Sequence, residues 1–149
     1  MSTNHDETCD CISQTHPAGI HLCYIYNDDE ERRQVMARFV NTGIDAGELV
    51  AYFADVEGSV EEYLEGMGIH LPTAGRNGQL RTLRAREVYA PDGQFLPDRM
   101  LDNLRSFHDE CKDSLYPAVR ITGETTWTLN DVPGCDRFIE YEARINSIL

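Results

Sequence analysis

Short apolar segments that alternate with helical patterns are the feature that most constrains how this chain folds. The apolar segments have the length and the aromatic and β-branched content of buried strands, and they cover residues 21–26, 49–53, 79–88 and 118–122. The amphipathic helical patterns start within 27–31 and end near Gly43 or Gly47, and then cover 59–66, 97–114 and 133–149. Such alternation predicts a parallel sheet with right-handed crossovers. We therefore expect an α/β fold, a three-layer sandwich with a mostly parallel sheet.

One domain accounts for nearly all of the chain. Its 149 residues are within the usual size of a single domain, and we assign residues 1–18 to a polar lead-in and residues 19–149 to the domain. The apolar segments fall short of the ~20 residues that cross a bilayer. The acidic N-terminus lacks the basic start and apolar middle of a secretory signal. The sequence therefore predicts a cytoplasmic protein.

The charge balance limits the partners of the chain. The chain has 26 Asp and Glu residues and 13 Lys and Arg residues, which gives a net charge of −13. Binding to phosphate backbones and to anionic lipids depends on Lys and Arg that replace counterions. We therefore expect no direct binding to nucleic acid and no membrane association.

Several stretches carry a resemblance to a known family. They are HLCYIYNDDEER at 21–32, FVNTGIDAGE at 39–48, YFAD at 52–55, EVY at 87–89, GQF at 93–95, RM at 99–100, RITGE at 120–124, Trp127, VPG at 132–134 and EYEARIN at 140–146. In order and spacing they resemble the MEDS domain, the sensory domain named for methanogens, methylotrophs and the dichloromethane regulator DcmR. The resemblance covers about residues 20–149.

This resemblance implies a function in sensing. A MEDS-like chain is expected to bind a small organic, hydrocarbon-like ligand and to act beside a regulatory protein or a kinase module, in signal transduction or transcription regulation. The family usually ends in a further strand after the last helix. This sequence has no candidate for that strand, which raises the alternative that it is a fragment of a longer protein.

The layout is also distantly similar to the RecA/KaiC class of P-loop ATPases. A P-loop needs glycines whose backbone N–H groups surround phosphates, together with a Lys and a Ser or Thr. The corresponding residues 27–33 contain no glycine and four acids. We therefore predict a RecA/KaiC-like fold without a functional P-loop and no enzymatic activity. A degenerate P-loop enzyme with Glu124 as general base is the alternative.

The predicted ligand site lies at the carboxyl ends of the strands, where open parallel sheets bind their ligands. Aromatic and polar residues at those ends predict an aromatic-lined cleft, although each aromatic could also fill the core. Glu124 needs a partner if it is buried, either the ligand or Arg120. The predicted ligand-binding residues are His21, Tyr24, Tyr26, Asn27, Phe53, Asp55, Arg120, Glu124 and Trp127.

The lead-in suggests a different function. Cys9, Cys11, His16 and His21 could supply four ligands for tetrahedral zinc, although their spacing is not that of a standard finger. A redox-sensing thiol pair at Cys9 and Cys11 is a further alternative. Apart from zinc, no cofactor is expected, and a homodimer is the default assembly.

Overall fold

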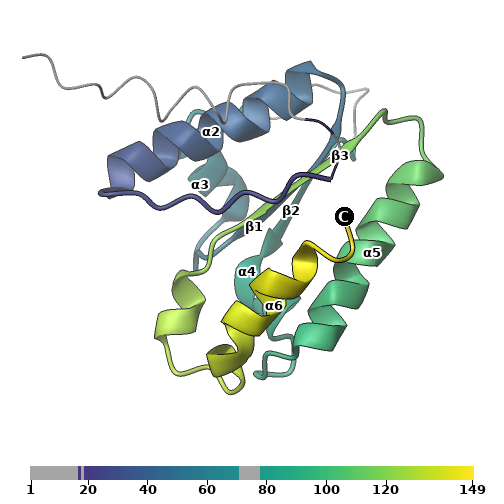
Figure 1. Cartoon of the computed structure of the whole chain (residues 1–149). Helices are drawn as coiled ribbons and strands as arrows, with labels where there is room; N and C mark the ends of the chain where they lie inside the picture. Colours follow the sequence, from purple (N-terminus) through teal and green to yellow (C-terminus); the bar gives the residue numbers. More distant parts are fainter. Residues whose placement is uncertain (1–16, 18, 71–77) are drawn as a thin grey trace, which may run out of the picture.

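A three-stranded parallel sheet with the order β2-β1-β3 lies at the centre of the molecule (Figure 1). The computed structural model describes residues 17, 19–70 and 78–149. The strands are β1 (Leu49–Ala54), β2 (Leu80–Arg84) and β3 (Val119–Gly123). In the central strand, Val50 pairs with Leu80 of β2 and with Arg120 of β3.

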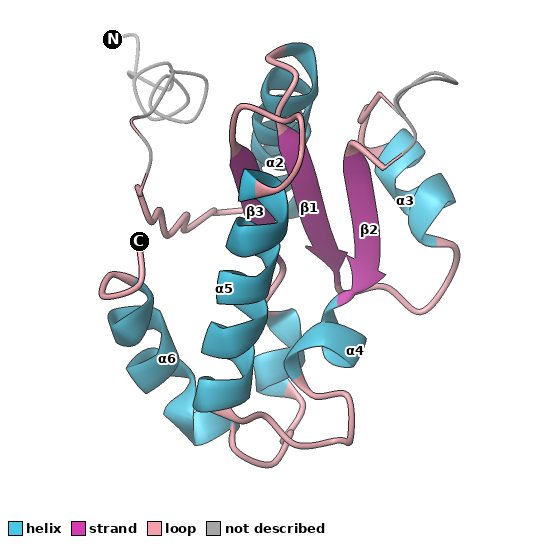
Figure 2. Cartoon of the chain, turned by 90° about the vertical axis from the view of Figure 1, so that its right-hand side faces the viewer, coloured by secondary structure: helices cyan, strands magenta, loops and turns pink. Residues whose placement is uncertain are grey.

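Helices cover both faces of this sheet, which confirms the expected three-layer α/β class (Figure 2). The helices are α2 (Asp29–Asp45), α3 (Val60–Gly66), α4 (Ala85–Tyr89), α5 (Pro97–Lys112) and α6 (Phe138–Ile145), with two 3₁₀ turns, η1 (Thr126–Leu129) and η2 (Cys135–Arg137). Alternate side chains of β1 face opposite layers because successive residues of a strand point to opposite sides. Val50 and Tyr52 pack with α2 and α3, and Ala51 and Phe53 pack with α4, α5 and α6.

The predicted first strand is wrong. Residues 20–26 form no strand in the structure, and Leu22 and Ile25 are 47% and 87% exposed. The segment lies alongside α2 and leads into its first turn (Figure 1). Tyr24 donates to Glu31 of α2, and His21 contacts Glu142 of α6. Its apolar composition fits a buried strand, but composition does not provide a neighbouring strand to pair with.

Two other boundaries differ from the prediction. The third predicted strand, 79–88, ends at Arg84, and the chain continues as helix α4. Helix formation buries Ala85 and Tyr89 on the same side of the helix, four residues apart. The last predicted helix begins at Phe138 rather than at Pro133, because Gly134 takes a left-handed conformation, with φ of 87°, that precedes the turn η2.

The layer between the sheet and helices α4, α5 and α6 is an aromatic cluster. The ring of Tyr89 lies at its centre and stacks on Trp127, with 5.0 Å between ring centroids. The other rings around Tyr89 are those of Phe53, Phe95, Phe138 and Tyr141. A Cβ atom on Gly123 would collide with the Tyr89 hydroxyl, so only glycine allows this approach.

Trp127 is part of this core and is fully buried. We expect Trp127→Ala to lower the free energy of unfolding by about 3–5 kcal/mol, because it leaves a large cavity among the rings. Urea denaturation followed by circular dichroism measures the change. Leu129→Ala in the same 3₁₀ turn is the control, since Leu129 is 82% exposed and should contribute little. Equal stability of the two variants would contradict the core role.

Candidate functional site

Glu124 lies at the carboxyl edge of the sheet, directly after β3. Its backbone N–H donates to the carbonyl oxygen of Phe53 at 2.9 Å, so it continues the pairing of β3 with β1 by one residue. The Glu124 side chain is only 9% exposed. A carboxylate buried to this degree requires donors from the protein.

Four donors surround this carboxylate, and we call them with Glu124 the Glu124 network. One oxygen, Oε1, accepts from the hydroxyls of Tyr52 and Tyr63, each at 2.7 Å, and from Arg32 Nη1. The other oxygen, Oε2, accepts the backbone N–H of Asp55 at 2.7 Å. The donors belong to α2, β1, α3 and the loop after β1. The network therefore joins both helices of one layer to the sheet.

The electrostatics of the network keep its donors protonated. Burial and the charge of Glu124 raise the pKa of Tyr52, and burial and the hydrogen bond to Glu124 raise the pKa of Tyr63 to about 12. Burial alone would lower the pKa of Arg32. Its hydrogen bond to Asp29 and the charge of Glu124 outweigh that effect, so the pKa of Arg32 is raised. At neutral pH both phenols and the guanidinium remain donors.

Of the two partners expected for Glu124, the ligand or Arg120, Arg120 is wrong. Arg120 Nε donates to Glu48 at 2.7 Å and its Nη1 donates to the carbonyl of Phe39, at the opposite, amino edge of the sheet. Arg32 takes the place that Arg120 was expected to fill. Sequence reasoning also missed Tyr52 and Tyr63. The one signal in the sequence was that a buried Glu124 requires hydrogen-bond donors. This requirement does not indicate which residues supply them.

A partly exposed rim adjoins the network. Asp55, whose side chain is 14% exposed, accepts from Thr126 Oγ1 at 2.6 Å and lies 3.6 Å from Arg86 Nε. Asp55 and Glu124 are both predicted site residues, and the backbone N–H of Asp55 brings them into direct contact. This rim is where a ligand could reach the network from solvent.

Carboxylates at the start of α2 accept hydrogen bonds from residues of the same stretch of chain. Asp28 caps the helix by accepting the backbone N–H of Glu31 at 2.8 Å. Glu31 in turn accepts the backbone N–H of Asn27 at 2.9 Å and the Tyr24 hydroxyl at 2.7 Å. This arrangement differs from a capping box in that Glu31 accepts from Asn27, the residue before the cap, rather than from Asp28 itself. Tyr24 and Asn27 thus gather around Glu31, and carboxylates occupy the place that a phosphate would need.

The remaining predicted residues lie apart from this edge. Phe53 and Trp127 belong to the aromatic cluster, and Tyr26 is 39% exposed beside the start of α2. His21 Nε2 lies 3.1 Å from Glu142 of α6.

The predicted zinc ligands Cys9, Cys11 and His16 lie outside the described residues. Within the described ranges, no group of three or more His, Cys, Asp and Glu side chains could hold a metal. Zinc binding and thiol redox sensing by the lead-in therefore stay predictions.

An open parallel sheet flanked by helices, with a buried carboxylate network at its carboxyl edge, defines the class of this domain as α/β. The family model described as the MEthanogen/methylotroph, DcmR Sensory domain (MEDS) matches residues 20–149. The chain belongs to the MEDS family of sensory domains. No curated protein and no solved structure gives a match. None of the helices in the described part of the chain is long and apolar enough to span a membrane.

We expect Glu124→Gln to destabilise the fold by about 3 kcal/mol, because it replaces a buried charged acceptor, which serves Arg32, Tyr52 and Tyr63, with a neutral amide. Thermal and urea unfolding of the variant measure this. Asp102→Asn is the matched control, since it breaks an exposed pair with Arg105 and should change stability by less than about 1 kcal/mol. Similar losses in the two variants would show that the network does not hold the helices.

Glu142 gives a prediction about pH. Burial raises its pKa, and the contact with His21 offsets this only in part. The fold therefore favours the neutral carboxyl, and this contribution to stability is lost as pH rises through the raised pKa. Glu142→Gln should gain stability relative to the native chain as pH rises from about 4 to about 7.

Glu140→Gln is the control, and its stability relative to the native chain should change with pH in the opposite direction. The hydrogen bond from Arg137 lowers the pKa of Glu140, so its contribution is present at neutral pH and is lost as pH falls. Melting temperatures of both variants across the same pH series should therefore diverge from the native chain in opposite directions. Parallel shifts would contradict the assignment for Glu142.

Proposed function

We propose that this sensory domain binds a small, neutral organic molecule at the carboxyl edge of its sheet and signals through the Glu124 network. The observation that carries the proposal is the buried carboxylate that joins α2, β1, α3 and β3 at this edge. A ligand that withdraws one donor, or adds one, changes how α2 and α3 are held against the sheet. Such a local exchange is a means of relaying ligand binding to a partner.

The chemistry of the edge supports a neutral ligand over a nucleotide. The start of α2 carries Asp28, Asp29, Glu30 and Glu31, which repel phosphates. The half-buried ring of Tyr63 provides apolar surface beside the polar network. A hydrocarbon-like molecule with one polar group is complementary to this combination.

Trp127 supports a ligand contact on the other side of the same loop. Its indole N–H is buried and has no hydrogen-bond acceptor within the described residues. An unpaired buried donor costs about 1–3 kcal/mol, and an acceptor atom of a ligand would remove that penalty. This proposal keeps Trp127, Asp55 and Glu124 as ligand-binding residues, with Tyr24, Tyr26 and Asn27 near the start of α2, and leaves out His21, which contacts Glu142 of α6.

The same network argues against catalysis by Glu124. A general base needs an oxygen that is free to accept a proton from the substrate. Here four donors occupy both oxygens of the carboxylate. We therefore propose a non-enzymatic sensor in the cytoplasm, which acts on a regulatory protein or kinase module as a monomer or homodimer and does not bind nucleic acid itself.

A ligand screen tests this function. Small neutral alcohols, ketones and hydrocarbons should change the fluorescence of Trp127, the single tryptophan of the chain, and raise the melting temperature. Tyr63→Phe, which removes one phenol from the network, should weaken the response several-fold. Tyr116→Phe is the control, because Tyr116 precedes β3 at the opposite, amino edge of the sheet.

Mg-ATP should produce neither change, because carboxylates occupy the edge where a triphosphate would bind. Equilibrium dialysis that finds micromolar affinity for Mg-ATP would contradict the proposed function. So would a screen in which every neutral ligand leaves both fluorescence and melting temperature unchanged.

A further inference from the structure

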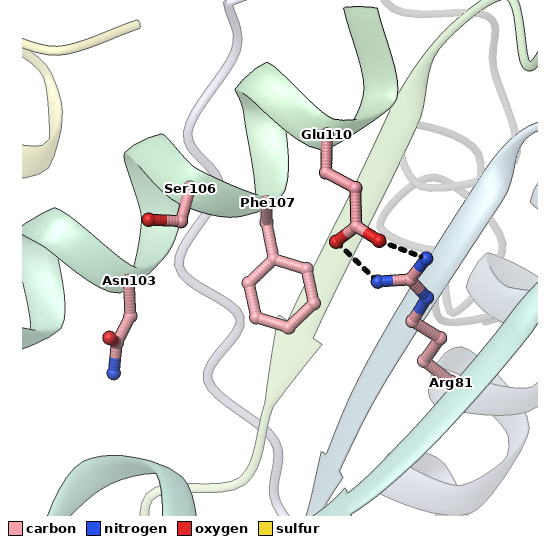
Figure 3. Close-up of a pocket in the computed structure, with 5 residues that line it drawn as sticks. All are labelled: Arg81, Asn103, Ser106, Phe107 and Glu110. Atoms are coloured by element: carbon pink, nitrogen blue, oxygen red, sulfur yellow. Dashed lines mark hydrogen bonds and ion pairs between the residues drawn. The ribbon is translucent and has the colours of Figure 1, made fainter. Parts of the chain in front are cut away.

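A cleft of about 220 Å³ lies between the edge strand β2 and helix α5, away from the carboxyl edge. It opens to solvent, and Figure 3 shows the side chains that line it: Arg81, Asn103, Ser106, Phe107 and Glu110. Nothing in the proposed function uses this cleft. Its position near the start of β2 separates it from the Glu124 network.

The topology explains why this face of the sheet is uncovered at β2. Arg81 and Leu83 pair with Ala51 and Phe53 of β1, so their side chains point to the α5 side. Helix α5 packs over Ala51 and Phe53 but leaves Leu83 39% exposed. The cleft occupies the space between the edge strand and the flank of α5.

The lining combines one apolar wall with free polar groups. The ring of Phe107 is held by Phe53, with ring centroids 5.8 Å apart, and forms a firm aromatic wall. The Asn103 carboxamide has no hydrogen-bond partner within the described residues, and it can both donate and accept. Ser106 Oγ donates to the carbonyl of Asp102 at 3.0 Å, which leaves its oxygen as an acceptor.

The charges of the cleft cancel. Arg81 donates to both carboxylate oxygens of Glu110, at 2.5 and 2.7 Å, so neither is available to an ionic ligand without losing its partner. The exposed acids Asp102 and Asp109 on the same helix make the surroundings unfavourable for an anion. A cationic ligand would gain little binding free energy from the Glu110 carboxylate, because that carboxylate is already paired with the Arg81 guanidinium.

We propose that this cleft binds a small neutral molecule with a single aromatic ring and a carboxamide-like polar group. The ring would lie against Phe107, and the polar group would exchange hydrogen bonds with Asn103 and Ser106. A cavity of about 150 Å³ accommodates benzene, so this cleft has room for one substituted ring. This site is separate from the proposed ligand site at the Glu124 network, and it would bind a second ligand.

Benzamide is the probe, and benzoate and benzylamine carry the same ring with opposite charges. Titration into ¹⁵N-labelled full-length chain, followed by amide chemical shifts, should give the largest shifts at Arg81, Asn103 and Phe107. Benzamide should bind more tightly than either charged analogue. Asn103→Ala should weaken it about five-fold, as expected for the loss of a hydrogen bond.

Two further variants make the test decisive. Ser106→Leu fills the cleft with a good helix former and should abolish the shifts without unfolding the chain. His108→Ala, on an exposed position of the same helix, should leave benzamide binding unchanged. The proposal is overturned if benzamide shifts no residue of the cleft, if the shifts cluster around Glu124 instead, or if Ser106→Leu retains them. Tighter binding of benzoate or benzylamine would overturn the neutral class.

Discussion

A carboxylate that is 9% exposed must be compensated by the protein around it, and Glu124 takes its donors from α2, β1, α3 and the loop after β1. Each donor is itself held in place: Tyr52 lies in a fully buried strand, and Arg32 is also bound by Asp29. The layer of α2 and α3 is therefore fixed to the sheet by polar contacts at one end and by apolar packing along its length. The polar end is the more adaptable of the two, because hydrogen bonds exchange partners more readily than a packed core does.

The loop after β3 couples the two sides of the sheet. Glu124 belongs to the polar network on the α2 and α3 side, and Trp127, three residues later, is packed among the rings on the side of α4, α5 and α6. Gly123 allows Tyr89 to approach the end of β3, so the aromatic cluster reaches the same point of the backbone. Glu124 and Trp127 thus lie three residues apart in one loop, on opposite sides of the sheet. The domain has a short physical path from one helical layer to the other.

The sequence predicts the central strands of the sheet well, but it predicts poorly which strands and which side chains pair with one another. Residues 49–53 form a nearly continuous apolar run, which only a strand covered on both faces accommodates, and β1 is buried throughout. Residues 21–26 have similar composition, but pairing depends on neighbours that composition does not specify. The choice of Arg120 for Glu124 was avoidable. Four residues of a strand span about 13 Å, which places the two side chains at opposite edges.

A sensor has to stay folded both with and without its ligand, and the carboxyl edge meets this requirement by satisfying its own polar groups. Asp28 and Glu31 bind backbone N–H groups at the start of α2, and Glu124 has a full set of donors. A P-loop leaves such N–H groups for phosphates, whereas this edge fills them from within. Any ligand must then replace an existing hydrogen bond, so the free energy of binding is the difference between two interactions of similar strength. For the ligand that we propose, this difference predicts reversible binding of moderate affinity.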